Sequence, residues 1–211
     1  MNNEVKKLPE SDPKSYGPKK PEIIDMAKNS KLFENKIILE QGKIITDFKA
    51  FDFPNCRFIG IGKRVGGESG AEPHDIWDKV LSDGTKERLN DLPGRIVPEN
   101  DLGGLMYDYD GETDTFMLIV GVFAESGTDV PEGYTYRDVP ACCMGVGRHI
   151  SYNDAMEDGA HERTVQAMKN AGYSPDYSLG LSAEYYPGKE YGDVEPGGLY
   201  TFCYLLPCKK V

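Results

Sequence analysis

The chain contains an internal repeat, in which apolar, glycine and basic residues follow one another in the same order twice. Residues 58–65 read Phe-Ile-Gly-Ile-Gly-Lys-Arg-Val, and residues 143–150 read Cys-Met-Gly-Val-Gly-Arg-His-Ile. A proline lies shortly before each copy, at Pro54 and at Pro140. A repeated supersecondary unit buries its apolar face against its neighbour, so the repeat predicts a duplicated fold. The paired glycines indicate strand bulging or the close approach of another segment.

Each copy is followed by a stretch in which apolar residues have helical spacing. In the first half, Pro73 suits the start of a helix, and the stripe consists of Ile76, Trp77, Val80 and Leu81. In the second half, Asn153 is a suitable N-cap and Gly172 a suitable end, and the stripe consists of Met156, Ala160, Thr164, Val165, Met168 and Ala171. The pattern therefore predicts one helix in each half.

Two strands are predicted after each helix, at residues 104–109 and 116–124 and again at residues 181–186 and 199–206. The chain thus reads β-α-β-β twice, which predicts an α+β fold with pseudo-twofold symmetry. Two half-sheets whose helices cover one face leave the other face concave between the halves. We therefore expect an antiparallel sheet with two helices packed on one face and a ligand groove on the other.

The boundaries of the repeat predict one domain at residues 46–211, with a first half at about 46–125 and a second half at about 134–208. The linker, residues 126–133, is rich in glycine, proline, aspartate and threonine, as loops are. Residues 1–45 are predicted to form an N-terminal tail or extension, because the first 20 are polar, charged and proline-containing. Short apolar groups between residues 21 and 53 are compatible with one or two strands or with a helix.

A single carboxylate stands out in the strand that ends in Pro187-Gly188. Because side chains alternate along a strand, Glu184 shares a face with Ser182 and Tyr186, while Tyr185 points to the core. Small residues beside a carboxylate leave room for a guest, and a carboxylate shielded from water needs a partner. A cation stacked on aromatic rings is the natural partner. The sequence predicts that Glu184 forms the floor of a ligand pocket; a solvated carboxylate on an exposed sheet face is the alternative.

Aromatic residues on the other predicted elements are candidates for the walls of this pocket. Overlaying residues 104–111 on residues 181–188 places Tyr107 at the position of Glu184. The predicted ligand-binding residues are Glu184, Tyr107, Tyr186, Trp77, Tyr204 and Phe202. For the tyrosines and Trp77 the alternative is packing in the core, and for Tyr204 and Phe202 core packing is the favoured interpretation.

The doubled β-α-β-β pattern, the strand at Tyr107–Tyr109 and the strand with Glu184-Tyr185-Tyr186 together resemble the GyrI-like effector-binding domains of the SOUL/GyrI-like superfamily. These domains also form the C-terminal half of AraC- and MerR-type regulators. The midsection is similar too: Val130-Pro131-Glu132-Gly133 and Val139-Pro140-Ala141 lead into the second half. The resemblance covers roughly residues 45–208 and rests on order and spacing rather than on one specific motif.

The resemblance implies two fused SH2-like halves with a groove that binds cationic, aromatic guests. Glu184 matches the family's buried glutamate, Tyr107 its aromatic in the first half, and Trp77 a groove tryptophan. Some stand-alone members hydrolyse cyclopropane-containing toxins with the same glutamate, and others protect DNA gyrase. The present chain has no predicted DNA-reading domain and a single tryptophan, whereas the hydrolase members use paired ones.

The composition of the chain limits the classes of partner that it is expected to bind. The net charge of −11 argues against direct binding to nucleic acid or to an anionic membrane, and no apolar run reaches bilayer length. Five cysteines without a C-x-x-C pair or a secretion signal predict reduced thiols in a cytoplasmic protein. No cofactor and no metal site is predicted, because the three histidines lack ligand spacing.

These patterns favour a stand-alone protein that binds small cationic or amphipathic aromatic molecules over an enzyme. The first alternative is a hydrolase of electrophilic toxins with Glu184 as the catalytic residue. The second is an interaction with a protein such as gyrase or a separate regulator. The sequence leaves open whether the chain is a monomer or a homodimer.

Overall fold

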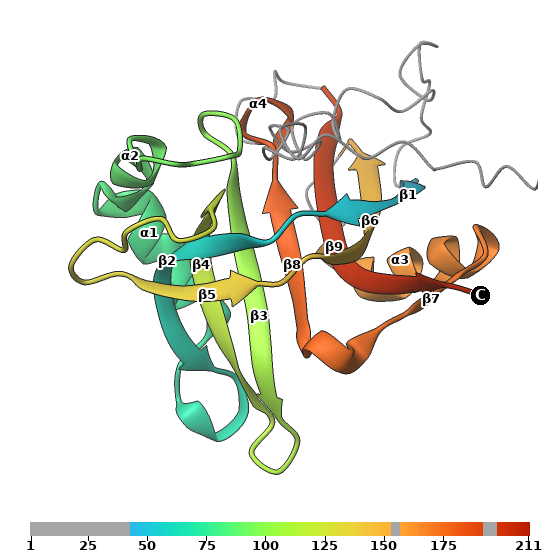
Figure 1. Ribbon diagram of the computed structural model, residues 1–211, viewed down its shortest axis with the longest axis horizontal. Coiled ribbons are helices and arrows are strands. Elements are labelled where there is room, and N and C mark those ends of the chain that lie inside the picture. The colour runs from blue at the N-terminus through green and yellow to red at the C-terminus, as the bar shows by residue number, and fades with distance from the viewer. Residues whose placement is uncertain (1–42, 153–156, 192–197) are drawn as a thin grey trace, which may run out of the picture.

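The computed structural model describes residues 43–152, 157–191 and 198–211. Within these residues the chain forms an α+β fold around one nine-stranded antiparallel sheet, which confirms the predicted class (Figure 1). The elements are β1 (Ile45–Phe53), β2 (Cys56–Val65), α1 (Pro73–Ser82), α2 (Thr85–Asn90), β3 (Leu102–Asp110), β4 (Thr115–Glu125), β5 (Thr135–Val139), β6 (Cys142–Ser151), α3 (Ala160–Asn170), β7 (Tyr173–Pro175), β8 (Leu181–Tyr186), α4 (Gly188–Tyr191) and β9 (Tyr200–Lys210).

The strand order is β1-β6-β9-β8-β3-β4-β2-β5, with β7 paired to β9. The two repeat copies are β2 and β6, and each pairs with the last strand of its own half, β4 or β9. The edge strands are exchanged between the halves, since β1 pairs with β6 and β5 pairs with β2. The four predicted strands after the helices are β3, β4, β8 and β9, and β3 and β8 meet at the centre. Strands β1 and β5 were not specifically predicted.

The paired glycines permit close approach, as predicted, but the neighbour differs between the two copies. In β6, a Cβ on Gly147 would lie 2.0 Å from Oγ1 of Thr164, so this glycine lets α3 pack directly on the sheet. In β2, a Cβ on Gly60 would lie 2.0 Å from the carbonyl oxygen of Val120 on the paired strand. One sequence motif therefore serves helix packing in the second half and strand packing in the first.

Helix α1 begins at the predicted position, whereas α3 begins at Ala160, after Gly159, and thus later than the predicted N-cap at Asn153 implies. Helix α1 starts at Pro73 and is closed by a capping box between Glu72 and Asp75. Its Ile76 and Val80 are buried, but Leu81, which the stripe placed in the core, is 55% exposed. After α3, Gly172 adopts a φ of 80° and ends the helix, as expected. Asn153 and Met156, like residues 1–42, lie outside the described residues.

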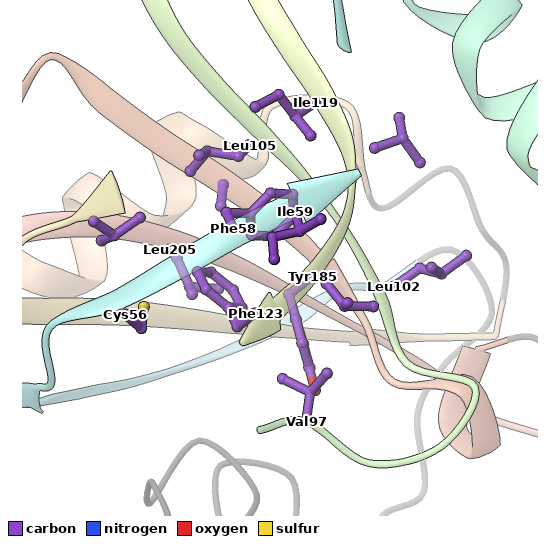
Figure 2. Packing of buried hydrophobic residues seen from close by; sticks show 14 of the residues in the cluster. Cys56, Phe58, Ile59, Val97, Leu102, Leu105, Ile119, Phe123, Tyr185 and Leu205 are labelled. Atoms are coloured by element: carbon purple, nitrogen blue, oxygen red, sulfur yellow. The ribbon is translucent and has the colours of Figure 1, made fainter. Parts of the chain in front are cut away.

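The core lies against the face of β8 that carries Tyr185. Figure 2 shows Tyr185 among Phe58, Phe123 and Leu205, with strands from both halves contributing side chains. The Phe58 and Phe123 rings meet edge to face at 4.7 Å. This packing fixes β8, and therefore also fixes the side chains on its other face.

The five cysteines are all free thiols. Cys143 and Cys208 lie across from each other, with 3.5 Å between their sulfur atoms. No helix among the described residues is long and apolar enough to cross a membrane.

Candidate functional site

Strand β8 divides into a core face and a partly open face, as its alternation predicts. Leu181, Ala183 and Tyr185 are buried, whereas Ser182, Glu184 and Tyr186 are half-buried. The carboxyl group of Glu184 is thus neither in bulk solvent nor fully enclosed, and the simple alternative of a solvated carboxylate does not describe it.

Glu184 lies in a row of three strands, directly across from Gly104 on β3 and Tyr204 on β9. Because Gly104 has no side chain, it leaves space in this row for the neighbouring side chains. A Cβ at Gly104 would lie 3.0 Å from Cζ2 of Trp77 and 3.6 Å from Oε2 of Glu184. The absence of a side chain at Gly104 therefore lets α1 bring the Trp77 ring beside the carboxylate, as the prediction for Trp77 requires.

The environment of Glu184 disfavours its charged form. Burial raises the pKa of Glu184 to about 7, and the nearby carboxylate of Glu157 adds to the rise. A hydrogen bond from the hydroxyl group of Tyr186 to Oε2, 3.1 Å long, acts in the opposite direction. Burial also raises the pKa of Tyr186, so this phenol remains a hydrogen-bond donor at neutral pH. The hydrogen bond from Tyr186 thus replaces only part of the stabilisation that water would give to the charged form of Glu184.

Aromatic rings surround Tyr186 on the same side of the sheet. Its ring centroid lies 4.9 Å from that of Trp77, 4.8 Å from that of Tyr191 and 5.0 Å from that of Phe202. Phe202 is fully buried and also stacks on His149, so it supports the wall from behind. Tyr191, on α4, had no signal in the sequence that linked it to this cluster.

Tyr204 forms the other side of the site. Its hydroxyl group donates a 3.0 Å hydrogen bond to Oγ of Ser182, and its ring meets that of His161 on α3 edge to face at 5.5 Å. Beyond Ser182 and Tyr204 a cavity of about 1000 Å³ opens toward solvent. Its lining includes Met106, His161, Tyr177, Ser182, Tyr204 and Leu206.

The structure brings together five of the six predicted residues but separates Tyr107 from them. Tyr107 pairs with Leu181 on β8 and Met117 on β4, so it points to the face opposite Glu184. The guanidinium group of Arg137 lies over its ring, 5.1 Å from the centroid, and Tyr107 is also among the residues that line the cavity. The overlay that matched Tyr107 to Glu184 therefore joins residues on opposite faces of the sheet, and the residue across from Glu184 is Gly104.

The face on which the site lies also differs from the expectation. Trp77 of α1 contacts Tyr186, and His161 of α3 contacts Tyr204. Tyr186 and Tyr204 share a face of the sheet with Glu184, so the carboxylate lies on the helix-bearing face, between the helices. The opposite face of β8 packs in the main core through Tyr185, and a second group of buried side chains, which includes Phe202 and Tyr204, lies on the helix-bearing face. Residues 43–152, 157–191 and 198–211 contain no cluster of three side chains that could hold a metal ion.

Comparisons with known proteins give matches only at the level of structure. No protein-family model matches the sequence, and no curated protein matches it. The structure of SAV2435 bound to tetraphenylphosphonium matches with a TM-score of 0.55 and 11% identity, covering 77% of this chain and 94% of that one. The C-terminal domain of EcmrR matches with a TM-score of 0.51 and 15% identity, covering 79% of this chain and 99% of that one. At such identities the likeness concerns the fold alone.

Proposed function

We propose that the protein binds small cationic or amphipathic aromatic molecules between α1 and α3, with Glu184 as their counter-ion. The observation that carries this proposal is the half-buried carboxylate of Glu184, whose raised pKa reflects incomplete compensation for lost water. A cation placed beside it would supply the missing opposite charge. The rings of Tyr186 and Trp77 stand close enough to the carboxylate to contact the same guest.

The expected interaction free energies favour a cation over a neutral guest. An ion pair that is largely removed from water is several times stronger than an exposed one. Each cation–π contact with a tyrosine or tryptophan ring adds on the order of 1 kcal/mol. A neutral aromatic guest would gain the ring contacts but leave the carboxylate without its partner. The binding of tetraphenylphosphonium by SAV2435, which shares the fold, makes this lipophilic cation a reasonable first probe.

Isothermal titration calorimetry with tetraphenylphosphonium tests the proposal. The variant Glu184→Gln keeps the shape of the side chain and removes its charge. We expect it to weaken binding by roughly 30-fold or more, corresponding to about 2 kcal/mol or more for a partly buried charge pair. Glu125→Gln, on the exposed end of β4, is the matched control and should leave the affinity unchanged. Equal affinity of wild type and Glu184→Gln would refute the proposal.

One observation also favours a second candidate, a hydrolase. A general base works best with a pKa near the operating pH, and the pKa of Glu184 is about 7. In this case Glu184 would take a proton from water as the water oxygen attacks a carbon of an electrophilic guest such as a strained cyclopropane. One ring C–C bond would break, its electron pair would move onto the guest, and the proton on Glu184 would then be returned to the guest. Mass spectrometry of a cyclopropane-containing electrophile after incubation distinguishes the two candidates. A ring-opened product that is absent with Glu184→Gln would support the enzyme, and an intact compound that still binds would support binding alone.

A further inference from the structure

The cavity of about 1000 Å³ lies beside the proposed cation site, and its floor is a different row of the sheet. Met106 on β3 pairs with Ser182 on β8, whereas Glu184 belongs to the next row with Gly104 and Tyr204. Side chains on one face of a strand repeat every second residue, about 7 Å apart. The cavity floor therefore lies about 7 Å from the row of the carboxylate.

A side-chain hydrogen bond joins the two rows. The hydroxyl group of Tyr204, from the row of Glu184, donates to Oγ of Ser182, from the cavity floor, at 3.0 Å. The opposite side of the Tyr204 ring rests against His161 of α3. Because this link is one hydrogen bond between neutral groups, rotation of either hydroxyl group is enough to release it.

The chemistry of the cavity differs from that of the carboxylate row. Its lining is mainly apolar and aromatic, with Met106, Phe116 and Leu206 on the strands and Tyr177 at the rim. Two carboxylates also line it: Asp108, which is engaged by Arg64, and Glu162 of α3. The apolar and aromatic majority of the lining suits an apolar group.

Resting on the proposed function, we propose that this cavity is a second subsite, which takes the apolar arm of a cation whose charged head pairs with Glu184. Tyr204 lies between the cation site and the cavity and determines specificity, because its hydrogen bond to Ser182 must open before one molecule can occupy both subsites. The preferred ligands are then singly charged cations that carry an extended alkyl or aromatic arm, and compact cations bind less tightly.

Calorimetry with methyltriphenylphosphonium and decyltriphenylphosphonium, both below micelle-forming concentrations, tests this proposal. Burying one methylene group contributes up to about fourfold in affinity, so the decyl compound should bind wild type at least about tenfold more tightly than the methyl compound. Ser182→Leu fills the cavity floor and should bring the ratio of the two dissociation constants close to one. Tyr204→Phe removes the hydrogen bond and keeps the ring, and should raise the ratio. Tyr136→Phe, on the exposed edge strand β5, is the matched control and should keep the wild-type ratio.

The outcomes separate this inference from the proposed function. A wild-type ratio near one, or a ratio that Ser182→Leu leaves unchanged, overturns the second subsite even when both probes need Glu184. A ratio that Tyr204→Phe leaves unchanged overturns the role of Tyr204. If the circular dichroism spectrum shows that Ser182→Leu is not folded, the result for Tyr204→Phe decides the proposal. If neither probe binds, or if Glu184→Gln binds both as wild type does, the proposed function fails and the second subsite fails with it.

Discussion

Tyr185 and Tyr186 are neighbours on β8, yet their hydroxyl groups donate to carboxylates on opposite faces of the sheet. Tyr185 points into the core and donates to Oδ2 of Asp101, which is 6% exposed. Tyr186 points between the helices and donates to Oε2 of Glu184. The same pair of groups, a phenol and a carboxylate, thus occurs twice within two residues of one strand.

The second carboxylate oxygen distinguishes the two pairs. Oδ1 of Asp101 accepts a 2.8 Å hydrogen bond from the backbone N–H of Gly188, so each of its oxygens has a donor and the Pro187-Gly188 turn is held in place. Within the described residues, Glu184 has one hydrogen bond, from Tyr186, and a cavity beside its row. A buried carboxylate whose oxygens are both used supports the fold, whereas one with an unused oxygen next to open space is suited to bind a guest.

The largest effect that this comparison predicts is on stability. Asp101→Ala leaves the Tyr185 hydroxyl group and the Gly188 N–H buried without an acceptor. Each unsatisfied group costs about 1–3 kcal/mol, so we expect unfolding free energy to fall by about 4 kcal/mol. Urea denaturation followed by circular dichroism measures this, with Glu184→Gln as the partner variant, which should not destabilise the protein at neutral pH. A loss below about 1 kcal/mol for Asp101→Ala would mean that the two carboxylates do not differ in the way described.

The second prediction concerns pH. The pKa of Glu184 rises from an ordinary 4.5 to about 7 on folding, so the folded state holds a proton that the unfolded state has released. The contribution of Glu184 to stability is therefore favourable below pH 4.5 and is lost as the pH rises to about 7. The loss is on the order of 3 kcal/mol for a shift of this size. Urea denaturation of wild type and Glu184→Gln across this range gives the difference, which should change with pH. A constant difference would show that Glu184 is not shielded from water.

The two glycines near the start of β3, Gly103 and Gly104, extend the comparison across the sheet. A Cβ at Gly103 would lie 2.9 Å from the carbonyl oxygen of Glu184 and 3.3 Å from the ring of Phe58, so Gly103→Ala should destabilise the core. A Cβ at Gly104 would meet Trp77 and the Glu184 carboxyl group instead. We expect Gly103→Ala to lower unfolding free energy by about 1–3 kcal/mol, as overpacking does, and Gly104→Ala to lower mainly the affinity for tetraphenylphosphonium. If Gly104→Ala binds the cation as wild type does, Trp77 and Glu184 do not form one site.

The sequence predicted the elements of the fold better than the register between them. Alternation along β8 was enough to separate Tyr185 from Glu184, and the repeat located β2 and β6, because both signals are local. The pairing of Glu184 with Gly104, rather than its match to Tyr107, depends on how two strands 80 residues apart slide past each other, and similarity of short strands does not fix that. No local pattern encodes the exchange of β1 and β5 between the halves, or the side of the sheet on which the helices pack. The consecutive glycines at 103 and 104 were a usable signal for close approach.

The smallest expected effect is that of the Tyr186 hydroxyl group. Tyr186→Phe keeps the ring against Trp77 and removes the hydrogen bond that stabilises the charged form of Glu184. The pKa of Glu184 should then rise further above 7, by less than about one unit, since a single hydrogen bond contributes about 1 kcal/mol. A cation binds the deprotonated carboxylate, so its affinity in wild type should increase with pH until about 7 and then level off. In Tyr186→Phe the pH at which affinity levels off should be higher, as measured by titration calorimetry at a series of pH values.

Tyr185→Phe, the matched change on the core face, should lower stability and leave the pH at which affinity levels off unchanged, because its partner is Asp101. An identical pH profile for wild type and Tyr186→Phe would mean that the phenol stabilises the ring cluster alone and does not adjust the charge of Glu184.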